Sequence, residues 1–360
     1  MTRTSNTRFL AILTVRNEGA FLIDWLAHHR ASGFTDFLVF SNDCQDGTDL
    51  MLDRLSAMGW LTHVRNDSGH KRGPQWSALK AANDHPLKKQ ADWILFFDID
   101  EYVNIHVGDR TLGALLQTLP EATAIPLTWR LFGNAGIRQY QDRPLPELFT
   151  RAAPAVMGWP WRAALFKTLF RNNGSYGKLG VHRPLQPDRA RLKHQRWFDG
   201  SGRELPSQMH TQRIFSAYGR DNYQLVQLNH YALGAMESYV VKCDRGRANR
   251  DAAAFDMSYW VERNLNTVED TSIHAQSHRS GPLRKSLHDD DILEAMHQKA
   301  VAWRHARFET LMEDESYRGL FGRLMMTPPS RTLTEAEHRI LARYAAQSAT
   351  RPRQETESSG

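Results

Sequence analysis

The chain has 360 residues, of which 41% are hydrophobic and 24% are charged, a balance typical of globular proteins. No apolar run approaches the roughly 18–20 residues that a membrane-spanning helix needs, and residues 1–8 lack the apolar core of a signal peptide. The only two cysteines, Cys44 and Cys243, are too few for a disulfide framework and suit a reducing compartment. We therefore expect a cytoplasmic enzyme.

Positive charge is concentrated in one part of the chain. The formal net charge is +6, yet residues 151–250 hold 17 Lys and Arg against 6 Asp and Glu. Such an excess predicts an anionic partner, which could be a diphosphate, an acidic glycan, a lipid headgroup or a nucleic acid. A basic face that is only solvated is the alternative.

The first 130 residues alternate the patterns of strands and helices. Short apolar runs predict strands, and apolar residues at helical spacing, ended by glycine, predict helices. The predicted strands are 9–15, 37–40, 61–64, 93–97 and 124–129, and the predicted helices are 21–32, 48–58, 75–83 and 112–119. This order predicts an α/β fold with a doubly wound, mainly parallel sheet.

The pattern changes after residue 130. Residues 131–235 are rich in Gly, Pro, Arg, Trp and His, and apolar pieces at 164–170 and 224–228 predict a few antiparallel strands over the open edge of the sheet. From residue 236 onward the sequence predicts helices, the clearest at 238–250, 292–312 and 334–346. We therefore divide the chain into four parts: 1–130, 131–235, a helical region at 236–346 and a disordered tail at 347–360.

Two aspartates follow the strand at 93–97 directly. Because this strand is apolar throughout, we expect it to be buried on both faces, with Asp98 and Asp100 at its end. Ligands of open α/β sheets bind beyond the carboxyl ends of the strands, so both carboxylates should face a crevice. Their oxygens suit a hard divalent cation such as Mn²⁺ or Mg²⁺, which can hold phosphate oxygens. A solvated acidic turn is the alternative.

Three polar loops should meet at this edge of the sheet. They follow three of the predicted strands and comprise residues 14–18, 41–46 and 98–101. Together they offer backbone amides, amide side chains and carboxylates, which suit a nucleotide base, a ribose and a metal-bound diphosphate. Each loop alone has a common turn composition, so the prediction depends on their order and spacing.

These loops resemble the nucleotide-sugar half of family 2-like glycosyltransferases with the GT-A fold. The matching segments are residues 15–18, 41–48 and 96–101. Asn229-His230-Tyr231 and residues 237–247 are similar to the bacterial branch of these enzymes and to the related family 92. The resemblance covers about residues 8–270. It implies a GT-A-like fold, with a Rossmann-like nucleotide-binding half before residue 130, an irregular acceptor-side region at 131–235 and a helical C-terminus without an assigned role.

The resemblance also implies an activity. The protein would be a metal-dependent glycosyltransferase that moves a sugar from a nucleotide-sugar donor, with a UDP-sugar favoured, to a hydroxyl of a glycan, polysaccharide or lipid-linked acceptor. Inversion of the anomeric carbon is favoured by the resemblance alone. Ser41-Asn42 stands where two acidic residues are common in the family, so the identity of the donor nucleotide stays open.

Site residues follow from the loops and from the resemblance together. Asp98 would approach the ribose or the waters of a divalent cation, Asp100 would bind this cation, and His230 would be a further ligand. A histidine that only packs beside Tyr231 is the alternative for His230. The candidate donor-binding residues are Thr14, Arg16, Asn17, Glu18, Asn42, Asp43, Asp46, Lys80 and Asp98.

Two further groups are needed for the reaction. Positive charge must stabilise the leaving diphosphate, and the candidates are Arg16, Lys71, Arg72 and Lys80, each of which could instead be a surface charge. An inverting transfer also needs a base for the acceptor hydroxyl. Glu147 is the favoured candidate, although an ion pair with Arg143 or Arg151 is the simpler explanation for it. His182 could contact the acceptor or a phosphate, or could be structural.

The alternative function is a non-enzymatic module that binds RNA or an acidic glycan through residues 151–250. Against it, the basic residues do not gather on one predicted helix face, and Asp98 and Asp100 would repel phosphate unless a cation intervened. We therefore expect no nucleic-acid partner. The basic region could also bring the protein to the surface of an anionic membrane.

Overall fold

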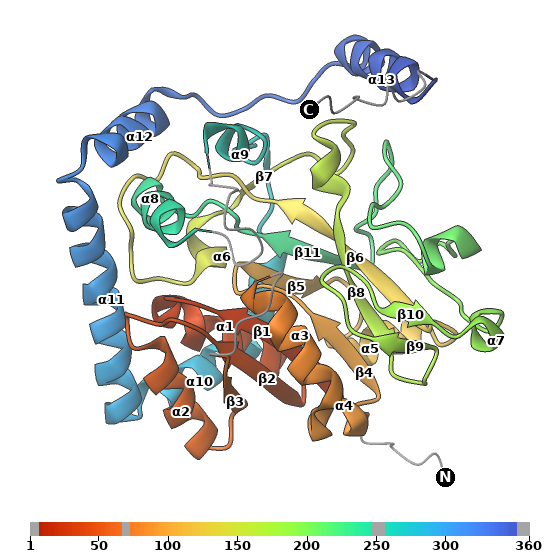
Figure 1. Cartoon of the computed structure of the whole chain (residues 1–360), viewed down its shortest axis with the longest axis horizontal. Coiled ribbons are helices and arrows are strands. Elements are labelled where there is room, and N and C mark those ends of the chain that lie inside the picture. Colours follow the sequence, from red (N-terminus) through yellow and green to blue (C-terminus); the bar gives the residue numbers. More distant parts are fainter. Residues whose placement is uncertain (1–6, 67–72, 247–255, 351–360) are drawn as a thin grey trace, which may run out of the picture.

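Four parallel strands form one half of the central sheet in the computed structural model, which describes residues 7–66, 73–246 and 256–350 (Figure 1). Their order is β3-β2-β1-β4. The strands are β1 (Phe9–Val15), β2 (Asp36–Ser41), β3 (Thr62–Arg65) and β4 (Trp93–Phe96). The helices between them are α1 (Gly19–Ala31), α2 (Thr48–Ala57), α3 (Pro74–Asp84) and α4 (Pro86–Gln90). Apart from α4, every one of these elements was predicted to within two residues at each end.

The other half of the sheet is mixed. It continues from β4 in the order β8-β6-β11-β5, in which β8 runs antiparallel to both of its neighbours and β11 runs parallel to β6 but antiparallel to β5. These strands are β5 (Glu101–Ile105), β6 (Ala124–Leu131), β8 (Phe166–Arg171) and β11 (Val226–His230). The α/β class is confirmed, and its parallel part is the N-terminal half.

The position of β8 and β11 corrects one prediction. The strands of residues 131–235 were expected to lie over the open edge of the sheet, but both lie inside it. All of β11 and all of β8 except Arg171 are buried, and backbone groups buried on both sides of a strand need partners on both sides. Only an interior place in the sheet provides those partners.

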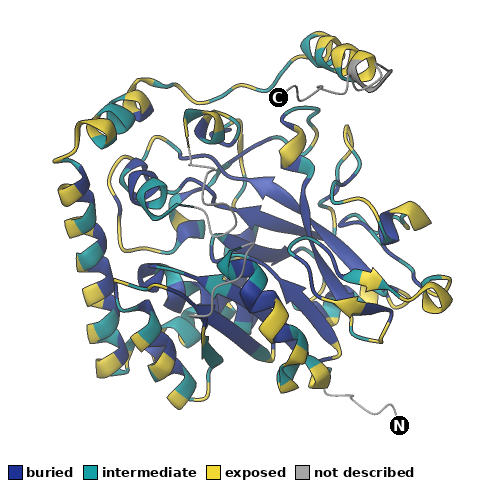
Figure 2. Ribbon diagram, in the orientation of Figure 1, coloured by how far each residue is buried: buried dark blue, intermediate teal, exposed yellow. Residues whose placement is uncertain are grey.

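Helices cover both faces of the sheet, as a doubly wound fold requires. Ala11 and Leu13 of β1 belong to the apolar cluster that contains Trp25 of α1, whereas Leu10 and Ile12 of the same strand belong to the cluster that contains α3. Most strands of the central sheet are dark blue in Figure 2 because they are buried along almost their whole length, whereas β3 at its edge is not. Alternate side chains of one strand therefore enter different cores.

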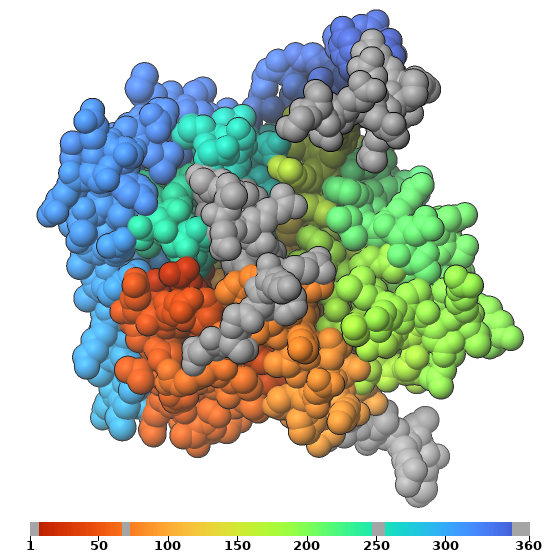
Figure 3. All heavy atoms as spheres, in the orientation of Figure 1, coloured from red at the N-terminus to blue at the C-terminus, as the bar shows by residue number. Residues whose placement is uncertain are grey.

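The C-terminal region is helical, as predicted, and packs beside the N-terminal elements. The long helix α11 (Asp291–Leu311) contacts α1 and α2, and its blue atoms lie along one side of the molecule next to red ones in Figure 3. The other helices here are α8 (Met236–Arg245), α9 (Met257–Val261), α10 (Ser277–His288), α12 (Glu315–Met326) and α13 (Glu335–Thr350). Across the described ranges, no helix combines the length and apolar character needed to cross a membrane.

Short elements complete the chain. The remaining helices are α5 (Leu112–Thr118), α6 (Leu145–Leu148) and α7 (Arg189–Leu192), with 3₁₀ turns at Trp161–Ala164, Ser207–His210 and Ser272–Gln276. Two small antiparallel pairs join β9 (Tyr176–Lys178) to β10 (Leu185–Pro187) and β7 (Arg151–Ala152) to β12 (Val268–Glu269). The disordered tail was predicted at 347–360, but residues 347–350 form the end of α13, and residues 351–360 lie outside the described residues.

Candidate active site

A cavity of about 520 Å³ opens at the carboxyl ends of β1, β2 and β4. The three polar loops that the sequence predicted to meet do meet here, because the parallel strands all point to this edge of the sheet. From these loops the cavity is lined by Thr14, Val15, Arg16, Glu18, Asn42, Asp43, Asp98, Ile99 and Asp100.

The opposite wall of the cavity comes from later parts of the chain. Trp129 lies on β6, Lys167 on β8 and His230 on β11, while His182 lies in the segment between β9 and β10. The helical region adds Lys242 and Arg245 from α8, together with Tyr259 and Arg263. The cavity is therefore built by the sheet and the C-terminal helices together.

Asp98 is held by a buried lysine. Its Oδ2 accepts a hydrogen bond from Nζ of Lys167 at 2.8 Å, and its Oδ1 accepts one from Nε2 of Gln75 at 3.3 Å. The Lys167 side chain is only 1% exposed. Burial opposes its charge, but Asp98 and the buried Glu101 outweigh burial and raise the pKa of the ammonium group. Both oxygens of Asp98 are thus already engaged.

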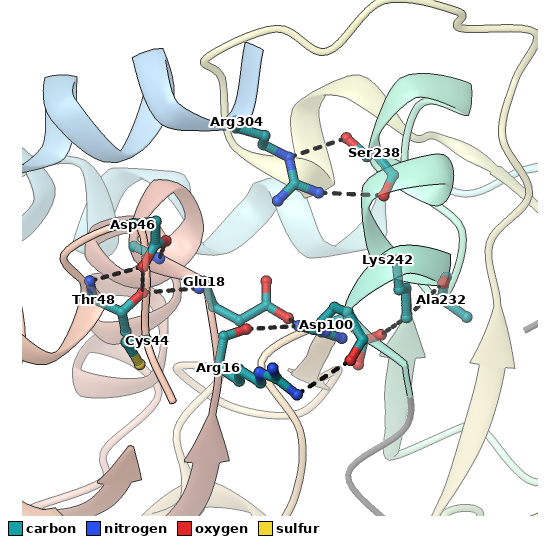
Figure 4. Close-up of polar contacts among 12 residues, drawn as sticks. Arg16, Glu18, Cys44, Asp46, Thr48, Asp100, Ala232, Ser238, Lys242 and Arg304 are labelled. Atoms are coloured by element: carbon teal, nitrogen blue, oxygen red, sulfur yellow. Dashed lines mark hydrogen bonds and ion pairs between the residues drawn. The ribbon is translucent and has the colours of Figure 1, made fainter. Parts of the chain in front are cut away.

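Asp100 is paired with the second lysine of the site. Its Oδ2 accepts a hydrogen bond from Nζ of Lys242 at 2.7 Å, and Lys242 also donates to the backbone carbonyl of Ala232 (Figure 4). Burial alone would raise the pKa of Asp100, but the charge of Lys242 outweighs it and lowers this pKa well below the usual range. The carboxylate is therefore ionised at neutral pH.

His230 lies next to Asp100 and is neutral. Burial lowers the pKa of His230 to about 3, and its ring packs against Trp129 with 4.3 Å between the ring centroids. Its Nε2 lies 3.8 Å from Oδ1 of Asp100, an oxygen that accepts no hydrogen bond from the described residues. The lone pair of a neutral imidazole and a carboxylate oxygen can both ligate a cation.

The pair formed by Asp100 and His230 fits a divalent cation only in part. Neighbouring ligand atoms in the octahedral shell of a Mg²⁺ ion lie roughly 3 Å apart, so the 3.8 Å between these two atoms would have to shorten. Within the part of the chain that the structure describes, no group of three or more His, Cys, Asp or Glu residues could hold a metal ion. A cation here would need oxygen ligands from a substrate as well, which is how Mg²⁺ commonly binds phosphates.

His182 lines the cavity with a defined ring orientation. Its Nδ1 lies 3.0 Å from the carbonyl oxygen of Phe166, so this nitrogen carries the proton in the neutral ring and Nε2 carries the lone pair. Burial, and then the charge of Lys167, lowers the pKa of His182 to about 4. The ring is therefore an unprotonated base at neutral pH.

Several predicted site residues do not line the cavity. Asp46 is buried below its loop, where it accepts hydrogen bonds from the backbone of Gly19 at 3.0 Å and of Thr48 at 2.9 Å, so it holds the first turns of α1 and α2. Asn17 accepts one from the backbone of Gln45 at 2.6 Å. These contacts explain both side chains without a ligand, and the structure does not support their assignment to the donor.

Two other predictions also lack support from the geometry. Lys80 is exposed on α3 and does not line the cavity. Glu147 lies in a separate small pocket, where it is 3.2 Å from Arg284 and 3.7 Å from Arg143, so the ion pair is the better explanation of its position. Lys71 and Arg72 lie outside the described residues.

Five cations that line the cavity had no predicted role: Arg162, Lys167, Lys242, Arg245 and Arg263. A signal existed for two of them, since Lys242 and Arg245 stand in the segment that resembles family 92, and another for Lys167, a lysine inside an apolar strand. Burial, and then the charges of Arg304 and Arg16, lowers the pKa of Arg245 to about 10. This shift reflects burial first and the positive charge of the neighbouring arginines second.

The family model of glycosyltransferase family 92 matches residues 14–196, just over half of the chain. A family 92 protein from Ricinus communis is 28% identical over 102 residues, which are 27% of this chain but only 17% of that protein.

Among solved structures, S. aureus TarS in complex with UDP is 17% identical, with 46% of this chain and 47% of that chain covered and a TM-score of 0.29. A second S. aureus TarS structure is 15% identical, covers 65% of this chain and 39% of that chain, and has a TM-score of 0.31. The resemblance seen in the sequence is confirmed by the family match, and the chain belongs to glycosyltransferase family 92.

Proposed function

We propose that this protein is a glycosyltransferase that takes a sugar from a nucleotide-sugar donor. The observation that carries the proposal is the cavity at the carboxyl ends of β1, β2 and β4, where the ionised Asp100 and the cations Lys242 and Arg245 line one space. This is the edge at which open α/β sheets bind nucleotides. A UDP-sugar is the donor that the sequence resemblance favours.

A divalent cation, Mn²⁺ or Mg²⁺, is part of the proposal. Oδ1 of Asp100 and Nε2 of His230 would hold it, and phosphate oxygens of the donor would complete its ligands. When bound, such a cation would neutralise charge on the leaving diphosphate. Asp98 contributes indirectly, because it holds the ammonium group of Lys167 in the cavity wall.

His182 is the base that we propose for the acceptor. Its Nε2 would take the proton of an acceptor hydroxyl while the hydroxyl oxygen forms the new bond to the anomeric carbon and the bond from that carbon to the diphosphate breaks. A carbonyl oxygen fixes the position of the other ring nitrogen. Attack from the acceptor side would invert the anomeric carbon, as the resemblance implies.

The structure gives no support to the alternative of a nucleic-acid-binding module. Some arginines of residues 151–250 have acidic partners: Arg196 pairs with Glu204 at 2.7 Å and also with Glu121, and Arg203 pairs with Asp199 at 2.8 Å. Pairing of this kind lowers the charge that these two arginines offer to a polyanion. The kind of acceptor and a contact with anionic membranes stay predictions from the sequence.

A donor screen tests the proposed function. We expect one of the UDP-, GDP- or dTDP-sugars to release its nucleoside diphosphate in the presence of Mn²⁺, measured by chromatography, and EDTA to suppress this release. Asp100→Asn should lower the rate by about a hundredfold or more, since it removes the charge beside the leaving group. Asp289→Asn is the matched control, because Asp289 is exposed and, of the residues that the structure describes, forms an ion pair with Lys285 alone. A screen with no turnover, or a rate for Asp100→Asn equal to that of the wild type, would contradict the proposal.

A further inference from the structure

The last turn of α8 carries two cations into the cavity. We propose that this turn binds the diphosphate of the donor, with Lys242 and Arg245 as the residues that contact its oxygens. The inference rests on the proposed function and extends it to the helical region, which the sequence left without a role.

Lys242 and Arg245 are placed on one side of the helix by their spacing. Residues three apart on an α-helix are neighbours on its surface, and both line the cavity. The helix ends at Gly246, whose φ of 74° lies in the left-handed region, and Gly246 lines the cavity too. The C-terminal end of a helix also favours positive charge. The helix therefore ends directly after the two cations that line the cavity.

Lys242 lies beside the carboxylate that we propose as a cation ligand. Its ammonium is 2.7 Å from Oδ2 of Asp100 (Figure 4). The other oxygen of the same carboxylate lies 3.8 Å from Nε2 of His230. A phosphate held at Asp100 through a cation would thus come within reach of Lys242. Charge-assisted hydrogen bonds from Lys or Arg to phosphate are among the strongest in proteins.

Arg245 joins a group of three guanidinium groups. Its Nη1 donates to the backbone carbonyl of Arg16 at 3.1 Å, and Nη1 of Arg16 donates to the carbonyl of Arg245 at 3.3 Å. Arg304 of α11 lies near them and donates to Ser238 of α8 (Figure 4). Glu18 is the ion-pair partner of Arg245, and Nε of Arg16 is buried without a hydrogen-bond partner among the described residues.

The lining of the cavity holds more positive than negative charge, with six Lys or Arg and four Asp or Glu among the described residues. Buried charges of one sign repel each other, and an anion between them relieves the repulsion. A sugar-linked diphosphate has the charge and the acceptor oxygens that such a site lacks.

A purely structural role would not explain the arrangement, because α8 has other anchors. Asp244 on the same turn pairs with Arg307 of α11 at 2.8 Å, and Tyr239 and Val240 are fully buried. The helix is therefore fixed without the cations that face the cavity.

Titration calorimetry of full-length variants tests the inference. The ligands are the nucleoside diphosphate that the wild type binds most tightly among UDP, GDP and dTDP, and the matching nucleoside, each with Mn²⁺ and with EDTA. We expect Lys242→Met and Arg245→Met to weaken diphosphate binding by about ten- to a hundredfold and nucleoside binding by less than about twofold. Lys242→Arg, which retains the charge, should recover most of the affinity.

The control is Arg307→Met, which removes an anchor of the same helix outside the cavity and should leave both affinities unchanged. Melting temperatures of all variants identify any that do not fold. In that case the affinities of Lys242→Arg are compared with those of the wild type. Diphosphate affinities of both Met variants equal to the wild type, or an equal loss for the nucleoside, would overturn the inference. If the wild type binds no nucleoside diphosphate at all, the proposed function fails first.

Discussion

The two aspartates at the end of β4 each contact a lysine, so a substitution of either aspartate also affects the lysine that it contacts. Lys242 is 15% exposed, and an alanine at Asp100 would remove the carboxylate that its ammonium group contacts. Removal of one partner of a buried pair costs about 3–5 kcal/mol. Asn keeps an oxygen that can accept the hydrogen bond, so Asp100→Asn separates loss of function from loss of stability better than Asp100→Ala.

The acidic pair could be predicted from the sequence, whereas its partners could not. Asp98 and Asp100 are separated by one residue at the end of an apolar strand, and strand ends have a known place in α/β sheets. Their lysines are 69 and 142 residues away. Only the order of strands in the sheet and the path of the C-terminal helices bring them together, and neither follows from local sequence patterns.

His182 gives a prediction at this scale. His182→Gln removes the proposed base, so the turnover number for transfer should fall by about 10²- to 10⁴-fold, while the affinity for nucleoside diphosphate stays near that of the wild type. His274→Gln is the control, since Nε2 of His274 also contacts a carbonyl, that of Pro146, but outside the cavity. Turnover of His182→Gln at the wild-type rate would show that another group takes the proton.

The edge of the sheet at β5 is covered by helix α1. β5 is the last strand, so one side of its backbone has no neighbouring strand. Two histidines of α1 take that place: Nε2 of His28 lies 2.8 Å from the carbonyl oxygen of Val103, and the backbone amide of Val103 donates to Nε2 of His29 at 3.2 Å. Side chains that occupy edge groups in this way prevent pairing with other chains.

Neither β5 nor this role of α1 was predicted. Residues 101–105 begin with Glu101, which reads as the end of an acidic turn, yet Glu101 is fully buried and accepts a hydrogen bond from Trp129. The helix pattern at 21–32 gave the position of α1 but not its polar contacts. The nine elements predicted before residue 130 are nevertheless present, because their apolar periodicity is local. The GT-A-like fold class is confirmed with them.

Because His28 is buried where it contacts Val103, the stability of the protein should depend on pH. Burial lowers the pKa of His28 to about 4 from an ordinary 6.5, so between these values the unfolded chain binds more protons than the folded one. Stability is therefore full above pH 6.5 and decreases as the pH falls toward 4, by roughly 3 kcal/mol for this group. Burial lowers the pKa of His29 as well.

Denaturant unfolding between pH 7 and 4.5 checks this expectation. His28→Gln, which can still donate to Val103, should lose less stability over that range than the wild type. His278→Gln, at an exposed position, should follow the wild type. If the free energy of unfolding falls equally with pH in His28→Gln and in the wild type, protonation of His28 does not cause the loss of stability.

On the scale of the whole molecule, the site combines residues of the N-terminal half with residues of the helical region. The N-terminal half supplies the loops of the sheet, and the C-terminal region supplies cations from α8, whose turn is tied to α11 by the pair of Asp244 and Arg307. Since α11 also packs on α1 and α2, the helices brace the sheet and complete the cavity together. The sequence resemblance covered both segments, but their meeting is a property of the fold.

A crystal structure with the selected nucleoside diphosphate and Mn²⁺ tests the central claim most directly. We predict that the nucleotide lies in the cavity at the ends of β1, β2 and β4, with its diphosphate between Asp100 and the last turn of α8. A nucleotide bound elsewhere on the protein, or a cavity that stays empty at saturating nucleotide, would contradict it.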